Sequence, residues 1–202
     1  VQSFQDSHLE LLGRRHTALQ AKEAYIRACA AGFSNINLDL MFGLPYQDMD
    51  DWKESLYQAI QLRPSHLSLY CLTLEQGTPM EQWVTQGKMS DPDPDQAAAQ
   101  YKQAQLLLRA AGYNHYEISN WALPGCESHH NLSYWYNLPF LGIGPGAYSY
   151  LNGHRFSDLS QPREYIKRIA AWWQSSIEAH VKPGEIDLAA LGLITNIDPI
   201  DV

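Results

Sequence analysis

The chain has 202 residues, of which 45% are hydrophobic and 18% are charged, and its formal net charge at pH 7 is −8. This composition is typical of a globular protein with one sizeable core. The acidic balance argues against a nucleic-acid-binding protein, since that function requires clustered lysine and arginine. No run of about 18 apolar residues occurs, so we expect no membrane span.

The three cysteines, Cys29, Cys71 and Cys126, are widely spaced and odd in number. They fit neither a disulfide framework nor a CxxC metal site, so we expect reduced and mostly buried thiols in a cytoplasmic protein. No signal peptide or transit sequence is visible. The chain starts at Val1 rather than at methionine, which leaves room for an upstream segment.

Helical and strand patterns alternate in the first half of the chain. The predicted helices span 19–31, 50–62 and 95–113, and the predicted strands span 35–45 and 66–75. Gly32 and Gly112 follow two stretches of good helix formers and act as stop signals. In the helix 50–62, the residues Trp52, Leu56, Ala59 and Ile60 share one face. This order of elements predicts parallel βαβ units.

The pattern changes after residue 113. Residues 115–126 are predicted to form a strand and a loop, 141–150 a glycine-rich turn, and 161–180 to contain one helix. The residues from Pro183 onward are expected to form a weakly structured tail. We therefore divide the chain into three segments, which are 1–113, 114–160 and 161–202.

Both predicted strands separate apolar from polar side chains by alternation. Leu38 and Leu40 share one face of the first strand, and Asn37 and Asp39 share the other. The second strand has the same division, with Leu67, Leu69 and Cys71 opposite Ser68 and Tyr70. An apolar outer set and a polar inner set favour a barrel with a functional interior, where Asp39 is a candidate binding residue. The alternative is that Asp39 caps a loop or pairs with an arginine.

Two further stretches are ambiguous when taken alone. Residues 128–137 read SHHNLSYWYN, and a histidine in such an aromatic-rich stretch is more often structural than a ligand. Residues 142–147 read GIGPGA, but Pro145 does not suit the helix that follows a dinucleotide-binding GxGxxG. The second stretch is therefore predicted to be a tight loop.

Seven motifs occur in a characteristic order. They are VQSF (1–4), LGRRH (12–16), NLDLMFGLP (37–45), LTLEQGTP (72–79), YEISNWALPG (116–125), HHNLSYW (129–135) and LGIGPGAYS (141–149). Over residues 1–160 the chain thereby resembles the radical SAM proteins related to oxygen-independent coproporphyrinogen III oxidase, and most closely their haem-chaperone branch. The resemblance implies an incomplete TIM-like (β/α)6 barrel that binds a 4Fe–4S cluster and S-adenosylmethionine.

VQSF resembles the fourth strand of that barrel. We therefore expect an α/β fold that consists of the C-terminal half of the barrel and a post-barrel extension, as a fragment of a longer protein. The cluster-binding CxxxCxC motif of the family is absent, so no 4Fe–4S ligand is assigned to this chain. No catalytic residue is assigned either.

The resemblance implies two sets of binding residues. Those that match S-adenosylmethionine-binding positions are Gln2, Arg14, Asp39 and Thr73. Those that match the HNxxYW haem motif are His130, Asn131, Tyr134 and Trp135. A neutral imidazole suits haem iron, so His130 is the expected axial ligand and the other three are expected to line the haem site. His129 precedes the motif and is the less favoured histidine.

The implied function of the complete protein is to bind haem in the cytoplasm and to transfer it to an acceptor protein. The alternative is an oxygen-independent coproporphyrinogen III oxidase, which catalyses an oxidative decarboxylation in porphyrin biosynthesis. A third possibility is a fragment without autonomous function. Two departures from the family are Tyr148, where relatives often carry histidine, and the dissimilar segment 183–202.

Overall fold

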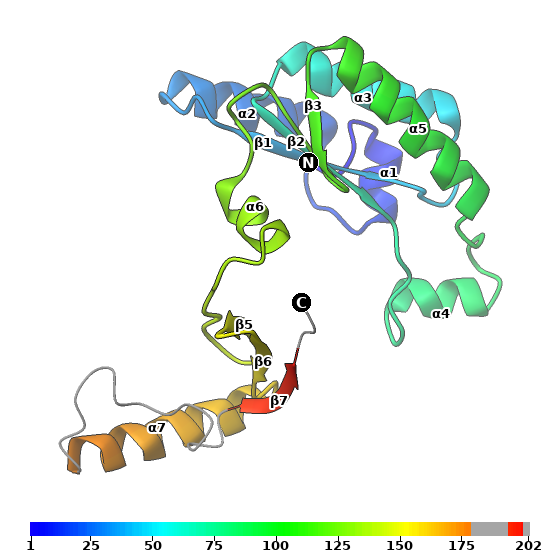
Figure 1. Cartoon of the computed structure of the whole chain (residues 1–202). Coiled ribbons are helices and arrows are strands. Elements are labelled where there is room, and N and C mark those ends of the chain that lie inside the picture. Colours follow the sequence, from blue (N-terminus) through cyan, green and yellow to red (C-terminus); the bar gives the residue numbers. More distant parts are fainter. Residues whose placement is uncertain (179–193, 200–202) are drawn as a thin grey trace. The chain divides into compact units, whose positions relative to one another are not determined.

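The computed structural model describes residues 1–178 and 194–199 of the chain (Figure 1). The chain forms two compact units, Val1–Glu127 and Ser128–Val202. The expected boundaries after residues 113 and 160 do not coincide with this division, because the strands that follow residue 113 join the sheet of the first unit. No helix within the described ranges combines the length and the hydrophobicity needed to cross a membrane.

The first unit is built on a mixed four-stranded sheet. Its strands are β1 (Asn37–Phe42), β2 (His66–Cys71), β3 (Asn114–Glu117) and β4 (Asn120–Ala122), in the order β1-β2-β4-β3. β1 and β2 are parallel and are connected through α3 (Met49–Leu62), which confirms the predicted βαβ unit. β4 pairs antiparallel with both β2 and β3. The predicted strand and loop at 115–126 is thus a hairpin, in which the backbone N–H of Ser119 donates to the carboxylate of Glu117.

The segment VQSF forms a single parallel bridge rather than a full strand. Gln2 N–H donates to the carbonyl of Asp39 (2.7 Å), and Met41 N–H donates to the carbonyl of Gln2 (2.8 Å). Because β2 occupies the other edge of β1, the segment lies where a further parallel strand would be. This arrangement is that of a partial barrel.

The helices of the first unit begin at clear capping residues. Thr17 and Gln20 form a capping box at α2 (Ala18–Ala30), and Asp48 and Asp51 form one at α3. Asp93 caps α5 (Pro94–Ala110). These three helices confirm the predicted ones. The sequence pattern missed α1 (Asp6–Leu11) and α4 (Pro79–Thr85), which are too short to display a helical period.

One face of the sheet carries the hydrophobic core. The leucines of β1 and β2 pack there against α3 and α5, which lie along the sheet (Figure 1). Three predicted helix-face residues, Trp52, Leu56 and Ala59, are fully buried in this core. The expectation of mostly buried cysteines is wrong. Cys29 and Cys71 are exposed and Cys126 is half-buried, because Cys29 lies off the core-facing side of α2 and Cys71 is the last residue of β2.

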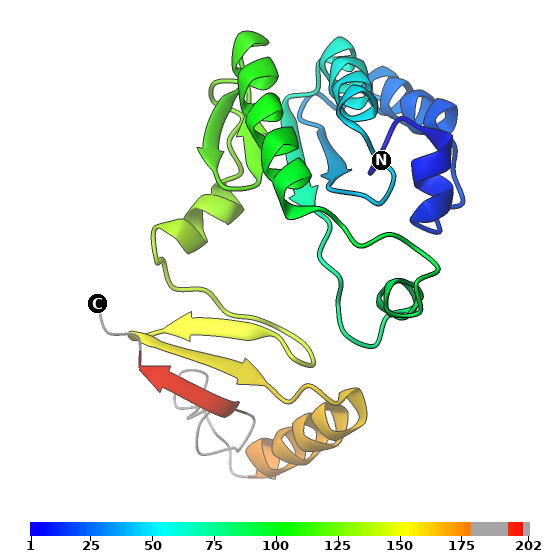
Figure 2. The same cartoon turned by 90° about the vertical axis from the view of Figure 1, so that its right-hand side faces the viewer.

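In its described residues, the second unit contains two helices and a three-stranded antiparallel sheet. Its elements are α6 (His129–Trp135), β5 (Tyr148–Leu151), β6 (His154–Asp158), α7 (Pro162–Glu178) and β7 (Ile194–Pro199). The strands lie side by side in the order β5-β6-β7 (Figure 2). The expected helix within 161–180 is confirmed as α7. The expected weakly structured tail is wrong for 194–199, which pairs with β6, and its remaining residues lie outside the described ranges.

Candidate functional site

The candidate cofactor site lies on the face of the β1–β2–β4 sheet opposite the core, which we call the polar face. The residues that define it are Asn37, Asp39, His66, Ser68 and Asn120. Strand register places Asn37 beside His66, Asp39 beside Ser68, and Ser68 beside Asn120. Leu38 and Leu40 are buried on the other side, which confirms the predicted separation of Asp39 from the apolar face.

Asp39 is held by one hydrogen bond on the polar face. Its Oδ1 accepts from Asn37 Nδ2 at 2.6 Å, and the side chain is half-buried. Among the described residues, no hydrogen bond or ion pair to the second oxygen, Oδ2, is found. The alternative roles of a loop cap or an arginine partner are therefore not those that Asp39 has here. A carboxylate with one free oxygen can accept a hydrogen bond from a ligand hydroxyl.

Gln2 is brought next to Asp39 by the bridge to β1. Its backbone has φ 69°, a left-handed conformation that non-glycine residues rarely adopt. Such strained positions persist only where surrounding bonds hold them, and here the two bridge hydrogen bonds do so. Gln2 and Asp39 are therefore neighbours, on the side of β1 that is not paired with β2.

The bridge to β1 does not include Arg14 or Thr73, which lie in two other segments of the chain. Arg14 is exposed in the turn after α1, where its backbone N–H donates to the carbonyl of Leu9. Thr73 is exposed two residues beyond the carboxyl end of β2. The structure thus brings Gln2 and Asp39 together, and it places Arg14 and Thr73 in two other segments.

A buried glutamine supports the loop that follows β1. Gln100 of α5 is fully buried and accepts from the backbone N–H of Gly43 at 2.8 Å. Its Nε2 donates to the carbonyls of Gln47 (3.1 Å) and Asp48 (3.3 Å). No sequence signal marks Gln100, because it lies in a helix rich in glutamine and the contact spans 57 residues.

The pKa of His66, on the polar face, is shifted by its surroundings. Burial lowers its pKa, and Asp39, Glu117 and Glu127 oppose that change. Its two ring nitrogens are hydrogen-bonded to Asn37 and Tyr116. His66 is a residue of the polar face that the sequence pattern did not predict, although it lies two positions before Ser68 in the same alternation. The period of two was the signal that could have found it.

The four haem-motif residues all belong to the short helix α6. Ser128 caps this helix by accepting from the backbone N–H of Asn131. At 3.6 residues per turn, positions i, i+1, i+4 and i+5 fall within roughly 140° of the helix circumference. His130, Asn131, Tyr134 and Trp135 therefore share one side of α6. The aromatic segment of the sequence is thus a helix, and the side chains of His130, Tyr134 and Trp135 are exposed on it.

His130 already has a partner on this helix. Its Nε2 lies 3.1 Å from Tyr134 Oη, and the two rings meet edge to face with centroids 5.0 Å apart. Tyr134 in turn contacts the Phe140 ring at 4.6 Å between centroids. An exposed imidazole flanked by aromatic rings fits the chemistry of a haem ligand.

The described residues do not fit a 4Fe–4S cluster. Cys29, Cys71 and Cys126 lie on α2, at the end of β2 and in the loop after β4. No group of three cysteine, histidine or carboxylate side chains that could hold a metal ion occurs in the described part of the chain.

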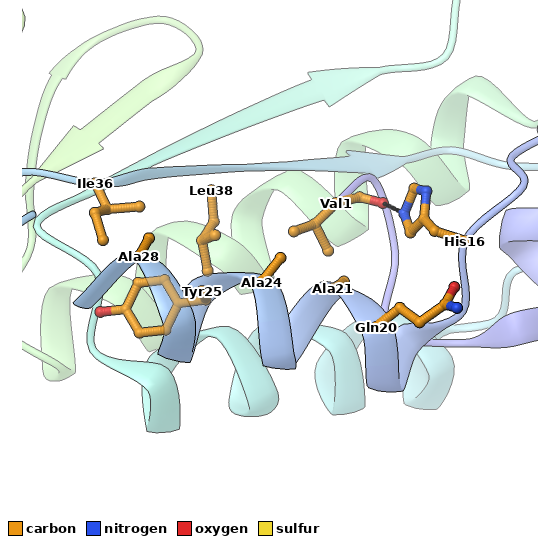
Figure 3. A pocket seen from close by; sticks show the side chains of 9 residues that line it. All are labelled: Val1, His16, Gln20, Ala21, Ala24, Tyr25, Ala28, Ile36 and Leu38. Carbon is orange, nitrogen blue, oxygen red and sulfur yellow. Dashed lines mark hydrogen bonds between the residues drawn. The ribbon is translucent and has the colours of Figure 1, made fainter. Parts of the chain in front are cut away.

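A separate apolar pocket of about 380 Å³ lies between α2 and β1. Figure 3 shows the side chains of α2, including Tyr25 and Ala28, opposite Ile36 and Leu38. Its polar edge is the His16 ring, whose Nε2 lies 3.2 Å from the Val1 carbonyl oxygen. Since Leu38 points away from Asp39 along β1, this pocket is not the candidate cofactor site.

The chain is similar to known proteins over most of its length. It is 40% identical over 172 residues to the protein named heme chaperone HemW from Synechocystis sp., covering 85% of this chain and 42% of the relative. It is 40% identical over 167 residues to heme chaperone HemW from Lactococcus lactis, covering 83% and 44%. It is 37% identical over 210 residues to mitochondrial radical S-adenosyl methionine domain-containing protein 1 from Mus musculus, covering 98% and 47%. No protein-family model matches the chain.

The chain spans less than half the length of these curated relatives. Among solved structures, it resembles the coproporphyrinogen III oxidase HemN from Escherichia coli, described as a radical SAM enzyme, with a TM-score of 0.66. That match has 20% sequence identity and covers 85% of this chain and 42% of the other. At this identity the likeness establishes the fold, and it confirms the expected partial radical SAM barrel.

Proposed function

Because this chain is homologous to part of the HemW haem chaperones, we propose that the complete protein binds haem and transfers it to an acceptor protein. The supporting observation is that the four named residues of the HNxxYW motif lie on one side of α6, with His130 exposed. His130 is the proposed axial ligand, and Asn131, Tyr134 and Trp135 would surround the porphyrin. The proposed location is the cytoplasm, and no nucleic-acid partner is proposed.

We also propose that the barrel of the complete protein binds S-adenosylmethionine and a 4Fe–4S cluster. Gln2, Arg14, Asp39 and Thr73 would contact the first of these. The free carboxylate oxygen of Asp39 suits a nucleoside hydroxyl, and Arg14 suits a carboxylate. The cluster would supply one-electron chemistry when bound, and its ligands would come from outside this chain.

A haem titration of the complete protein tests the proposal. Replacing His130 by alanine is expected to weaken haem binding by at least about tenfold and to alter the Soret band, because an axial ligand is lost. His129→Ala is the matched control and is expected to leave both unchanged. An unaltered affinity and spectrum in His130→Ala would overturn the assignment of His130.

Because the fold resembles that of HemN, the alternative to haem transfer is the activity of an oxygen-independent coproporphyrinogen III oxidase. Anaerobic assay of the complete protein for decarboxylation of coproporphyrinogen III separates the two. We expect no decarboxylation, together with transfer of bound haem to an apo-acceptor.

Because this chain has no cluster-binding cysteine set, we further expect that the chain alone neither assembles a stoichiometric cluster nor cleaves S-adenosylmethionine. Reconstitution of the chain with iron and sulfide tests this expectation, and the formation of one cluster per chain would contradict it.

A further inference from the structure

The orientation of the Asn37 side chain on the polar face is fixed by its neighbours. Asn37 Nδ2 lies 2.6 Å from Asp39 Oδ1, and an ionised carboxylate can only accept. The amide oxygen of Asn37 must therefore face the opposite way, where His66 Nδ1 lies at 2.7 Å. Since an amide oxygen is an acceptor, Nδ1 of His66 must carry the proton in this bond.

The tautomer of His66 fixes the next bond in turn. Burial lowers the pKa of His66 and so favours its neutral form, which has one donor and one acceptor nitrogen. With the proton on Nδ1, Nε2 accepts from the hydroxyl of Tyr116 at 2.6 Å. The hydrogen bonds thus run in one direction, from Tyr116 to His66 to Asn37 to Asp39. His66 is 6% exposed, so its ring is shielded from water, whereas Asn37 is exposed.

Ser68 does not compete for Asp39, although the two residues are neighbours in the strand register. Its Oγ lies 2.5 Å from Oδ1 of Asn120 and 3.2 Å from Oδ1 of Asn37. A hydroxyl has a single proton, and the shorter contact with Asn120 takes it. Among the residues that the structure describes, Asn37 alone therefore holds Asp39 Oδ1, and Oδ2 is the oxygen available to a ligand.

We propose that Asn37, oriented by His66 and Tyr116, is a positioning residue that holds the Asp39 carboxylate for a hydroxyl of the S-adenosylmethionine nucleoside. This inference rests on the proposed role of Asp39 in cofactor binding. In this role the three residues act through Asp39. They come from β1, β2 and β3, so the hairpin after the parallel strands contributes to a site on the first of them.

A double-mutant cycle in the complete, anaerobically reconstituted protein tests this inference, with S-adenosylhomocysteine as the titrated probe. Asp39→Ala is expected to weaken binding about tenfold, and Asn37→Ala about fivefold, through loss of the hydrogen bond that orients the carboxylate. In the Asp39→Ala background, Asn37→Ala is expected to have less than about a twofold effect. Asn35→Ala is the matched control, because Asn35 bonds Ser65 and not Asp39.

Tyr116→Phe keeps the packing of the ring and removes only the hydroxyl, so it provides a second, milder variant. It is expected to weaken binding about twofold, and only when Asp39 is present. Equal effects of Asn37→Ala in both backgrounds would overturn the positioning role while leaving Asp39 in the site. An unchanged affinity of Asp39→Ala would overturn both the role of Asp39 and the inference built on it.

Discussion

Tyr134 and His130 are hydrogen-bonded to each other across one turn of α6, with 3.1 Å between Tyr134 Oη and His130 Nε2. Both side chains are exposed, so the bond is formed at the surface of the second unit. Nε2 of a neutral imidazole carries either one proton or one lone pair, so in neither tautomer can it keep this bond and bind iron at once. Tyr134 therefore competes with any metal that binds this nitrogen.

Replacing Tyr134 by phenylalanine is expected to strengthen haem binding by the complete protein about twofold to fivefold, the equivalent of one modest hydrogen bond. A Soret titration measures this change. Tyr136→Phe is the matched control, since Tyr136 is an exposed tyrosine that follows the same helix. Weaker binding by Tyr134→Phe would contradict competition and would show that the hydroxyl instead supports an imidazole bound through Nδ1.

Acid is expected to destabilise the chain below the ordinary histidine pKa of about 6.5. Burial lowers the pKa of His8, with Asp51 and Asp48 opposing it, and burial likewise lowers the pKa of His66. The unfolded chain therefore takes up protons before the folded chain does as the pH falls, and the free energy of unfolding decreases.

Urea denaturation at about pH 7.5 and about pH 5.5 measures this loss. His8→Gln is expected to reduce the difference between the two pH values. His154→Gln, at an exposed position, is the control. A free energy of unfolding that rises between the higher and the lower pH would contradict the prediction.

Gln100→Met is expected to destabilise the first unit by about 1–3 kcal/mol, because it leaves the buried N–H of Gly43 without its acceptor. Thermal unfolding should report this as a midpoint lower by roughly 2–4 °C for each kcal/mol. Gln96→Met is the matched control. Gln96 is half-buried and donates one bond to the Gln47 carbonyl, so its loss should cost less than about 1 kcal/mol. Equal midpoints for the two variants would refute the supporting role of Gln100.

Gly43→Ala is expected to be more harmful than Gly77→Ala. Both glycines have positive φ, 69° and 81°, so each alanine incurs about 1–2 kcal/mol of backbone strain. At Gly43 the added Cβ would also lie 3.2 Å from Ala97 Cβ and from Cys71 Sγ, whereas at Gly77 nothing lies within 4 Å. The unfolding free energies of the two variants should therefore differ by about 1 kcal/mol. No difference between them would show that the β1 loop can shift to accept the methyl group.

Much of the first unit could be predicted because its signals are local. Helix-forming stretches, glycine stop signals and apolar periodicity located α2, α3 and α5, and alternation located β1, β2 and the face on which Asp39 lies. These patterns report which side of each element is buried, and that is a property of a short stretch of chain. The order of the motifs then indicated a partial radical SAM barrel, which the likeness to HemN confirmed.

Short elements and long-range pairings were harder to predict. The helix α6 spans only seven residues, and it was interpreted as an aromatic stretch because one or two turns do not establish a period. The hairpin β3–β4 joins β2 through pairing that local sequence does not encode. The same limit explains why the cysteines were expected to be buried, since exposure depends on which elements cover them.

The sequence by itself determined the polar character of one strand face and the identity of Asp39 as its acidic residue. Only the tertiary structure decided that Asn37 holds one oxygen of this carboxylate, that His66 and Tyr116 orient Asn37, and that Tyr134 occupies the ring nitrogen of His130. Alternation follows from the backbone of a single strand, whereas the direction of a hydrogen bond depends on donors and acceptors that other strands bring from up to 50 residues away.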